Sequence, residues 1–186
     1  MGYLSQFKIS FSGLSQGLHE YNYTIDDKFF EEAQFSGSDI KRAKINLDID
    51  LVKQSGMLTL TFKFESQIQV SCDRCLNDNF IPVNGVQRLI VKFAEEREYE
   101  PKDDDEVLIL APSETELDIA QYVYEYINLL MPYQRIPCEI LNDFSLCNQE
   151  VIEKLTHYQS HGTPAKEEID PRWEALKSIS SKKKNK

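Results

Sequence analysis

Two neighbouring runs of alternating residues constrain the fold of this chain more than any other feature of its sequence. In residues 43–51 and 58–64 every second side chain is apolar, and the residues between them are charged or polar. The apolar positions are Ala43, Ile45, Leu47, Ile49, Leu51, Leu58, Leu60, Phe62 and Phe64. Gln54-Ser55-Gly56 between the runs is typical of a turn. The pattern predicts a β-hairpin with one buried face and one face in water.

Shorter patterns predict the remaining elements. The predicted strands cover residues 3–11, 19–25, 68–71, 80–83, 86–93 and 107–110. Short helices are expected over residues 27–33, with Asp26 as the N-cap, and over residues 147–158. Apolar residues at helical spacing, behind a Ser113-x-x-Glu116 capping box and ahead of Pro132, predict an amphipathic helix over residues 114–131.

The elements together predict an α+β fold. We expect a mainly antiparallel, hairpin-rich sheet with one long amphipathic helix and short flanking helices. Residues 1–160 are predicted to form a single domain. Residues 161–186 are predicted to form a linker, a short closing helix and a basic tail, because His161-Gly162-Thr163-Pro164 resembles a linker and lysines dominate the last six residues.

The charge of the chain is negative and unevenly distributed. The formal net charge is -10, with a sequence pI of about 4.8. Residues 161–186 hold 7 Lys and Arg against 4 Asp and Glu, a balance of +3, so residues 1–160 carry -13. A body of this charge repels phosphate at long range, which argues against a nucleic-acid-binding domain of the usual basic kind. It suits a basic protein partner, with RNA contact left to the tail.

No segment of the sequence predicts a membrane span or a secretory signal. No apolar run approaches the ~20 residues that cross a bilayer, and the first ten residues lack a basic stretch followed by an apolar one. We therefore expect a cytoplasmic protein whose four cysteines are reduced.

The cysteines carry the clearest chemistry of the sequence. Cys72-Asp73-Arg74-Cys75 places two thiols at a spacing that suits one metal ion or a redox pair, and Cys138 and Cys147 add two more. Four thiolates suffice for one closed structural zinc site, which would fasten the loop after the hairpin to the segment after the helix. The second pair is spaced more widely than ordinary zinc ligands, so small buried thiols without a ligand are an equal alternative. A redox pair is the third and weakest interpretation, because such a motif is expected to open a helix in a βαβ unit and this one lies among antiparallel strands.

Catalytic motifs are missing from the sequence. There is no phosphate-binding glycine loop and no Gly-x-Ser-x-Gly motif, and the three histidines adjoin no evident nucleophile. The acid-rich residues 94–106 lack the spacing of a calcium loop and are interpreted as a solvated loop, with docking of a basic partner as the alternative. We predict a protein that is not an enzyme and needs no small-molecule substrate.

Three ordered motifs resemble the YceD family. They are the Cys72-Asp73-Arg74-Cys75-Leu76 motif, the acid-rich span followed by Asp118-Ile119 and a helix that ends in Leu129-Leu130-Met131-Pro132, and Ile169-Asp170-Pro171-Arg172-Trp173-Glu174-Ala175-Leu176-Lys177. The resemblance implies a bacterial ribosome assembly factor that promotes accumulation or processing of large-subunit ribosomal RNA. The implied partners are a ribosomal protein or pre-ribosomal RNA. A metal or redox protein that uses Cys72 and Cys75 is the alternative function.

The closing motif and the tail supply the predicted contact residues. Asp170 would cap a short helix with Pro171 in its first turn, which presents an aromatic and an aliphatic side chain to a partner groove or to its own domain. The predicted partner-binding residues are Arg74, Asp170, Pro171, Arg172, Trp173 and Leu176. The predicted nucleic-acid contacts of the tail are Lys182, Lys183, Lys184 and Lys186.

Overall fold

The computed structural model describes residues 2–32, 40, 42–94 and 107–160. The chain divides into two compact units, residues 1–147 and residues 148–186, and each is described by itself. The predicted linker, closing helix and tail lie outside the described residues, as does most of the acid-rich segment. The predicted boundary at residue 160 stays a prediction.

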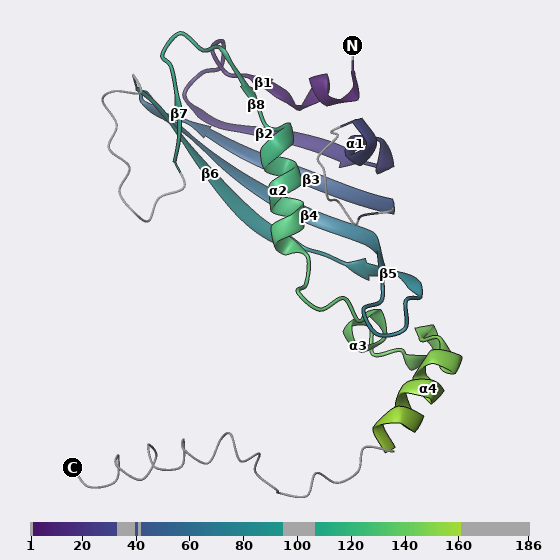
Figure 1. Cartoon of the computed structure of the whole chain (residues 1–186). Coiled ribbons are helices and arrows are strands. Elements are labelled where there is room, and N and C mark those ends of the chain that lie inside the picture. The colour runs from purple at the N-terminus through teal and green to yellow at the C-terminus, as the bar shows by residue number, and fades with distance from the viewer. Residues whose placement is uncertain (1, 33–39, 41, 95–106, 161–186) are drawn as a thin grey trace, which may run out of the picture. The chain divides into compact units, whose positions relative to one another are not determined.

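A mixed sheet of six strands forms the body of the first unit (Figure 1). Its strands are β2 (Gly17–Ile25), β3 (Arg42–Lys53), β4 (Met57–Ser71), β5 (Asp78–Pro82), β6 (Gly85–Phe93) and β7 (Val107–Leu110). The order is β2-β3-β4-β6-β7, and β5 pairs with the far end of β4. All pairs are antiparallel except β6 with β7, which run parallel. The fold is therefore α+β with a mainly antiparallel sheet, as predicted.

The predicted hairpin is confirmed as β3 and β4. Leu47 lies opposite Phe64, and Ile49 lies opposite Phe62. All nine apolar positions of the alternating pattern are buried. Their polar neighbours form an opposite face of mixed charge, on which the Lys63 Nζ lies 2.7 Å from a carboxylate oxygen of Asp50.

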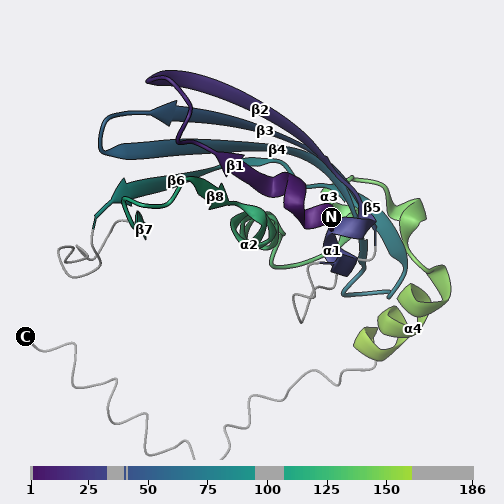
Figure 2. The same ribbon diagram turned by 90° about the horizontal axis from the view of Figure 1, so that it is seen from above.

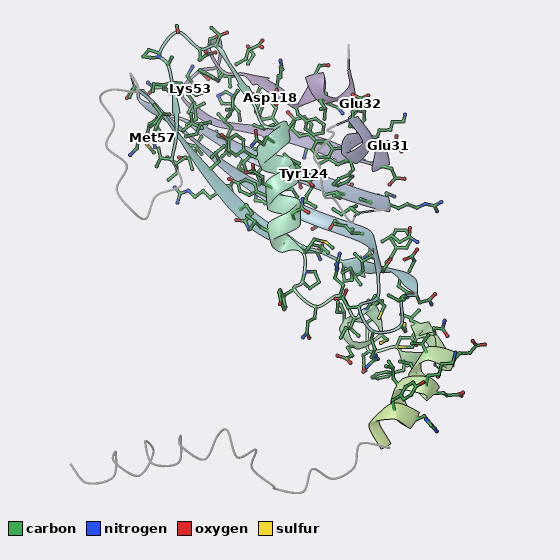
Figure 3. The ribbon with its side chains drawn as sticks, viewed as in Figure 1. Glu31, Glu32, Lys53, Met57, Asp118 and Tyr124 are labelled. Carbon is green, nitrogen blue, oxygen red and sulfur yellow. The ribbon has the colours of Figure 1, made fainter. Side chains whose placement is uncertain are left out.

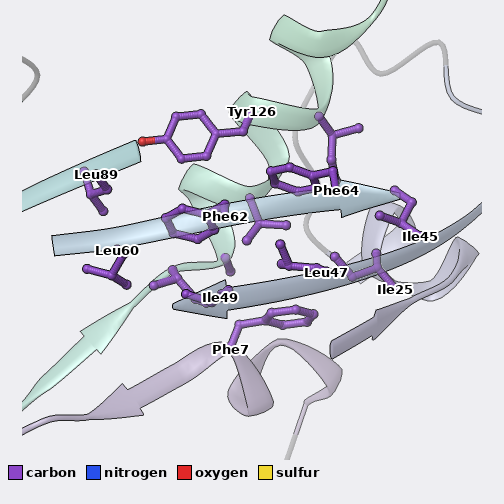
Figure 4. Close-up of a cluster of buried hydrophobic side chains, with 14 of the residues drawn as sticks. Phe7, Ile25, Ile45, Leu47, Ile49, Leu60, Phe62, Phe64, Leu89 and Tyr126 are labelled. Atoms are coloured by element: carbon purple, nitrogen blue, oxygen red, sulfur yellow. The ribbon is translucent and has the colours of Figure 1, made fainter. Parts of the chain in front are cut away.

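Four smaller elements cover the apolar face of the sheet (Figure 2). They are the 3-10 helix η1 (Tyr3–Phe7), α1 (Asp27–Glu32), the two-stranded sheet of β1 (Lys8–Ser10) and β8 (Glu116–Asp118), and α2 (Ala120–Leu130). Tyr126 of α2 packs edge-on against Phe62 with ring centroids 5.2 Å apart, and Figure 4 shows both beside Leu60 and Leu89. Burial of this apolar surface holds the layers together.

Two side chains fasten the N-terminal segment to the body (both labelled in Figure 3). A carboxylate oxygen of Glu32 accepts the Tyr3 backbone N–H at 2.7 Å. The Lys53 Nζ donates to the carbonyl oxygens of Phe11 at 2.8 Å and Leu14 at 2.9 Å. The ammonium group therefore closes the loop between β1 and β2.

The prediction of one long helix over residues 114–131 is wrong in its first turns. Residues 116–118 form β8, in which Leu117 pairs with Ile9, and α2 covers only residues 120–130. The Asp118 carboxylate accepts the Ala120 N–H at 3.0 Å, in place of the expected cap at Ser113. Leu117 can reach the core either from a strand or from a helix, so the spacing of apolar residues did not distinguish a strand from a helix here. Pairing with β1 decided the outcome.

The other boundaries vary in how well they were predicted. Residues 3–11 are not one strand, because η1 precedes the short β1. The short helix after Asp26 is confirmed as α1, and the Lys28 N–H donates to the Asp26 carboxylate at 3.1 Å. The strand at residues 107–110 is confirmed as β7. In the second unit, α4 (Gln149–Ser160) confirms the last predicted helix, while α3 (Pro137–Ile140) and the 3-10 helix η3 (Phe144–Leu146) of the first unit were not predicted.

Candidate functional site

The loop between β4 and β5 folds tightly around the first cysteine pair. The Leu76 N–H donates to the Cys72 carbonyl at 2.9 Å, and the Cys72 N–H donates to the Asn77 carbonyl at 2.9 Å. Leu76 adopts a φ of 60°, and its side chain is 78% exposed. Both thiols are buried, so the turn directs Cys72 and Cys75 inward.

The second cysteine pair lies on the short helices that follow α2. Cys138 is in α3, and Cys147 comes directly after η3. The Asp143 N–H donates to the Cys138 carbonyl at 2.9 Å, and the Asp143 carboxylate caps η3 by accepting the Ser145 N–H at 3.0 Å. Both of these thiols are also buried.

Polar contacts join the two cysteine segments. Two hydrogen bonds link Asp73 and Arg135: the Asp73 N–H donates to the Arg135 carbonyl at 2.8 Å, and the Arg135 N–H donates to the Asp73 side-chain carboxylate at 2.7 Å. The Asn77 side-chain amide donates to the Leu146 carbonyl at 2.9 Å. The fold thus brings together the loop after the hairpin and the segment after α2.

Arg74 lies at the centre of this junction. Its Nη2 lies 2.9 Å from the Cys138 Sγ and 3.5 Å from the Cys147 Sγ, while its Nη1 donates to Glu139 at 2.9 Å. Its backbone N–H donates to the Cys72 Sγ at 3.4 Å. Its Nε is buried without a hydrogen-bond partner. We call Arg74 with Cys72, Cys75, Cys138 and Cys147 the arginine–cysteine cluster.

The electrostatics of the cluster favour a neutral thiol at Cys138. Burial raises the pKa of Cys138, the hydrogen bond with Cys147 adds to this, and the Arg74 charge opposes it. The hydrogen bond to the Cys147 sulfur raises the pKa of Arg74, which therefore stays charged. A protonated, buried thiol is a poor nucleophile, so the arrangement does not favour redox chemistry at Cys138.

The metal prediction and the partner prediction for these residues both stay predictions. Among the residues that the structure describes, no three His, Cys, Asp or Glu side chains are arranged to hold a metal ion as they stand. The zinc site stays a prediction. The sequence predicts a partner contact for Arg74. In the structure the Arg74 guanidinium contacts the cysteines and Glu139. The spacing of residues in the sequence carries no signal for the contact between Arg74 and the cysteines. The predicted residues 170–173, 176, 182–184 and 186 lie outside the described chain.

A groove runs between α2 and β7. Two adjoining hollows, of about 270 and 470 Å³, share Leu108 and Tyr122. Their other lining residues are Leu4, Leu89, Val107, Leu110, Glu116, Leu117, Asp118, Ala120, Gln121, Glu125, Tyr126 and Leu129. We call this surface the α2–β7 groove. It has an apolar floor and three carboxylates, and none of the lining residues is basic.

A comparison with protein families identifies the family of the chain. The family model for the large ribosomal RNA subunit accumulation protein YceD matches residues 60–180. The chain belongs to the YceD family.

The YceD match covers all members of the arginine–cysteine cluster, α2, β7 and the closing motif, and it begins within β4. The family name links YceD proteins to accumulation of large-subunit ribosomal RNA. No curated protein and no solved structure matches the chain. Within the described part of this YceD chain, no helix has the length and apolar character needed to span a membrane.

Proposed function

We propose that the chain is a cytoplasmic ribosome assembly factor that promotes accumulation of large-subunit ribosomal RNA by binding and not by catalysis. The YceD match over residues 60–180 is the observation that carries this proposal. The α2–β7 groove supports it, because none of the residues that line this groove is a nucleophile paired to a base.

The partner in this proposal is a basic segment of a large-subunit ribosomal protein that lies in the α2–β7 groove. Glu116, Asp118 and Glu125 complement a cationic segment, and Leu108 and Leu129 provide apolar contact. β7 ends the main sheet and pairs with β6 alone among the described strands. An extended segment can therefore add to β7 through backbone hydrogen bonds.

A protein partner suits the charge of the chain better than RNA. A net charge of -10 repels phosphate and attracts a basic protein, and both effects weaken as salt screens them. In this proposal the lysines of the tail make any contact with RNA.

The cellular experiment measures the ratio of large-subunit to small-subunit ribosomal RNA in cells that lack the protein. The expected result is a lowered ratio, restored by the wild-type gene. An unchanged ratio, together with recovery of neither ribosomal proteins nor large-subunit RNA in a low-salt affinity purification, contradicts the proposed function.

The binding experiment compares two lysine substitutions on exposed leucines. Leu129 lines the groove and is 68% exposed, whereas Leu18 lies on β2 and is 57% exposed. Leu129→Lys is expected to weaken binding of the purified ribosomal protein at least tenfold, and Leu18→Lys is expected to leave it unchanged. Equal effects of the two substitutions would contradict binding in the groove. Binding that is abolished by ribonuclease, or by Lys→Gln changes at residues 182–184 and 186, would favour RNA as the partner.

A metal protein is the second candidate function. The arginine–cysteine cluster is the observation that favours it, since four buried thiols and one charged guanidinium are gathered at one junction. It concerns a different part of the molecule from the groove.

A further inference from the structure

The strand β2 forms one margin of the main sheet and differs from the strand at the opposite margin. It has nine residues, and β3 is its one neighbour among the strands that the structure describes. Figure 2 shows β2 as the outermost strand of the sheet. Edge strands are commonly short or carry Lys or Pro, which discourages pairing with another chain. β7 at the other margin has four residues, whereas β2 is long and contains neither Lys nor Pro.

The hydrogen-bond pattern of the sheet shows which backbone groups of β2 are directed outward. The Gln54 N–H donates to the Met57 carbonyl at 2.9 Å and closes the hairpin of β3 and β4. Hydrogen-bonded positions alternate along antiparallel pairs, so even-numbered residues of β3 bond to β4 and odd-numbered residues of β3 bond to β2. In the register of β2 with β3, odd-numbered residues lie opposite odd-numbered residues. The even-numbered residues of β2 therefore direct their N–H and C=O groups away from the sheet. They are Leu18, Glu20, Asn22 and Thr24.

The described contacts occupy only one end of this outward edge. The Tyr3 hydroxyl donates to the Thr24 carbonyl at 3.3 Å, which agrees with the outward direction of that carbonyl. Within the described ranges, no residue bonds to the outward backbone groups of Leu18, Glu20 or Asn22. A row of unpaired N–H and C=O groups is a template for a further strand.

The side chains of β2 fit a second copy of the same strand. Two copies that run antiparallel about a two-fold axis centred on Glu20 would place two carboxylates directly opposite each other, which is unfavourable. Centring on Tyr21 instead places Glu20 opposite Asn22 of the second copy, and Leu18 opposite Thr24. Tyr21 is also the middle residue of β2, so this register pairs the whole strand.

The register centred on Tyr21 uses every outward backbone group. The even-numbered residues become hydrogen-bonded pairs, and the carbonyl oxygen of Thr24 has a second lone pair besides the one that Tyr3 uses. Tyr21 lies opposite Tyr21 of the second copy as a pair without hydrogen bonds, where side chains approach most closely. Aromatic pairs at such positions stabilise antiparallel strands.

We propose that two copies of this chain associate through β2, antiparallel and centred on Tyr21, so that their main sheets form one continuous sheet. The contact uses the same surface on both copies, so it closes at two chains. β2 and β7 lie at opposite margins of the sheet, so the α2–β7 groove is not part of this contact. The inference therefore goes beyond the proposed function and does not depend on it.

Charge opposes this association at long range. Residues 1–160 carry a balance of -13, so two bodies repel each other, and added salt screens the repulsion. The pair of copies is therefore expected to strengthen as salt is raised. Binding of a basic segment in the groove should weaken under the same change, so the two interactions have opposite salt dependence.

The primary experiment is sedimentation equilibrium of the full-length protein under reducing conditions, over a range of protein and salt concentrations. We expect the apparent mass to rise from the 21.6 kDa of one chain toward twice that mass, and to rise further at high salt. The mass of one chain at every concentration overturns the proposal. A pair that dissociates as salt is raised also overturns it, because that result indicates contact between the acidic body and a basic segment.

Cross-linking tests the register. Cα atoms of a pair without hydrogen bonds lie about 4.5 Å apart, within the range of about 4.4–6.8 Å that a disulfide spans. Under mild oxidation, Tyr21→Cys is expected to form a covalent pair at least tenfold faster than Glu20→Cys, whose two copies lie out of register. The wild-type protein, with four buried cysteines, gives the background. Equal rates, or faster cross-linking of Glu20→Cys, overturn the register.

Two substitutions at Asn22 separate backbone pairing from side-chain effects. Asn22→Pro removes an outward N–H without removing a bond to β3, and proline is tolerated at such positions of edge strands. We expect it to sediment as one chain at concentrations where the wild type is paired. Asn22→Ala is the control, because it also loses the side-chain bond to Asp48 at 2.5 Å but keeps the N–H, and it should still pair.

The remaining outcomes of these variants are decisive as well. Equal loss of pairing in Asn22→Pro and Asn22→Ala overturns the role of the backbone edge. If Asn22→Pro does not fold, the comparison of Tyr21→Cys with Glu20→Cys decides. Loss of ribosomal-protein binding in a folded Asn22→Pro would show that the edge takes an extended segment of that protein, and would overturn a second copy as the occupant. Absence of pairing would leave the large-subunit RNA ratio and the Leu129→Lys result unchanged.

Discussion

Single residues define the two most specific features of this molecule. Arg74 joins the cysteine segments through its guanidinium, and Lys53 closes the N-terminal loop through its ammonium group. Both side chains link segments because their charged ends donate to acceptors that the fold brings from distant parts of the sequence. Leu76 acts through its backbone alone.

Leu76→Gly should stabilise the protein by up to about 1 kcal/mol. Glycine adopts a φ of 60° without the steric penalty that a side chain brings, and little buried area is lost because Leu76 is 78% exposed. Denaturant unfolding of the purified protein measures the change. Leu76→Ala is the control and should show no gain, since alanine keeps the Cβ; equal gains would indicate that φ is not the cause.

Lys53→Met should cost about 1–2 kcal/mol of unfolding free energy. The substitution keeps the aliphatic stem of the side chain and removes the charged donor from the carbonyls of Phe11 and Leu14. Lys63→Met on the exposed sheet face is the matched control, and little change is expected there because its pair with Asp50 is in solvent. Comparable losses in the two variants would contradict the assigned role of Lys53.

At the scale of elements, α2 and the main sheet determine each other's position. Tyr126 and Ile127 of α2 are buried against the sheet, and Leu130 at its end approaches Gly85 at the start of β6. A Cβ at position 85 would meet the methyl groups of Leu130, so glycine permits the close approach of helix and strand there.

Gly85→Ala should destabilise the fold by about 1 kcal/mol, because the added methyl displaces the Leu130 side chain. A double-mutant cycle with Leu130→Ala measures the coupling. The second substitution removes the obstacle, so Gly85→Ala should cost less in that background. Strict additivity of the two changes would show that the contact does not matter.

At the scale of the whole molecule, the chain combines a folded acidic body with a basic end. The body has one large core between the sheet and its covering elements, and the unit that contains it ends at residue 147. The positive balance lies in residues 161–186. This separation is consistent with a stable body that does not depend on the end.

Truncation after residue 160 should leave the thermal unfolding midpoint unchanged, because the predicted domain contains every element of the core. Differential scanning calorimetry of full-length protein and of residues 1–160 provides the comparison. A midpoint lowered by several degrees would show that the closing segment packs on the body, and the prediction of a separate tail would be wrong.

Elements whose pattern is local could be predicted from the residues alone. Alternation in residues 43–51 and 58–64 predicts strands because successive side chains of a strand point to opposite faces, and Asp26 predicts the start of α1 because a cap acts within one turn. The family resemblance, likewise carried by short motifs, was confirmed over residues 60–180.

Features that depend on contacts between distant residues could be found only in the folded chain. Leu117 belongs to a strand because β1 offers it a partner, although its spacing equally fits a helix. Arg74 reaches Cys138 and Cys147 because the end of α2 returns the chain to the β4–β5 loop. Periodicity records which face of an element is apolar, whereas the partner of that face is set by packing, and no local pattern carries that information.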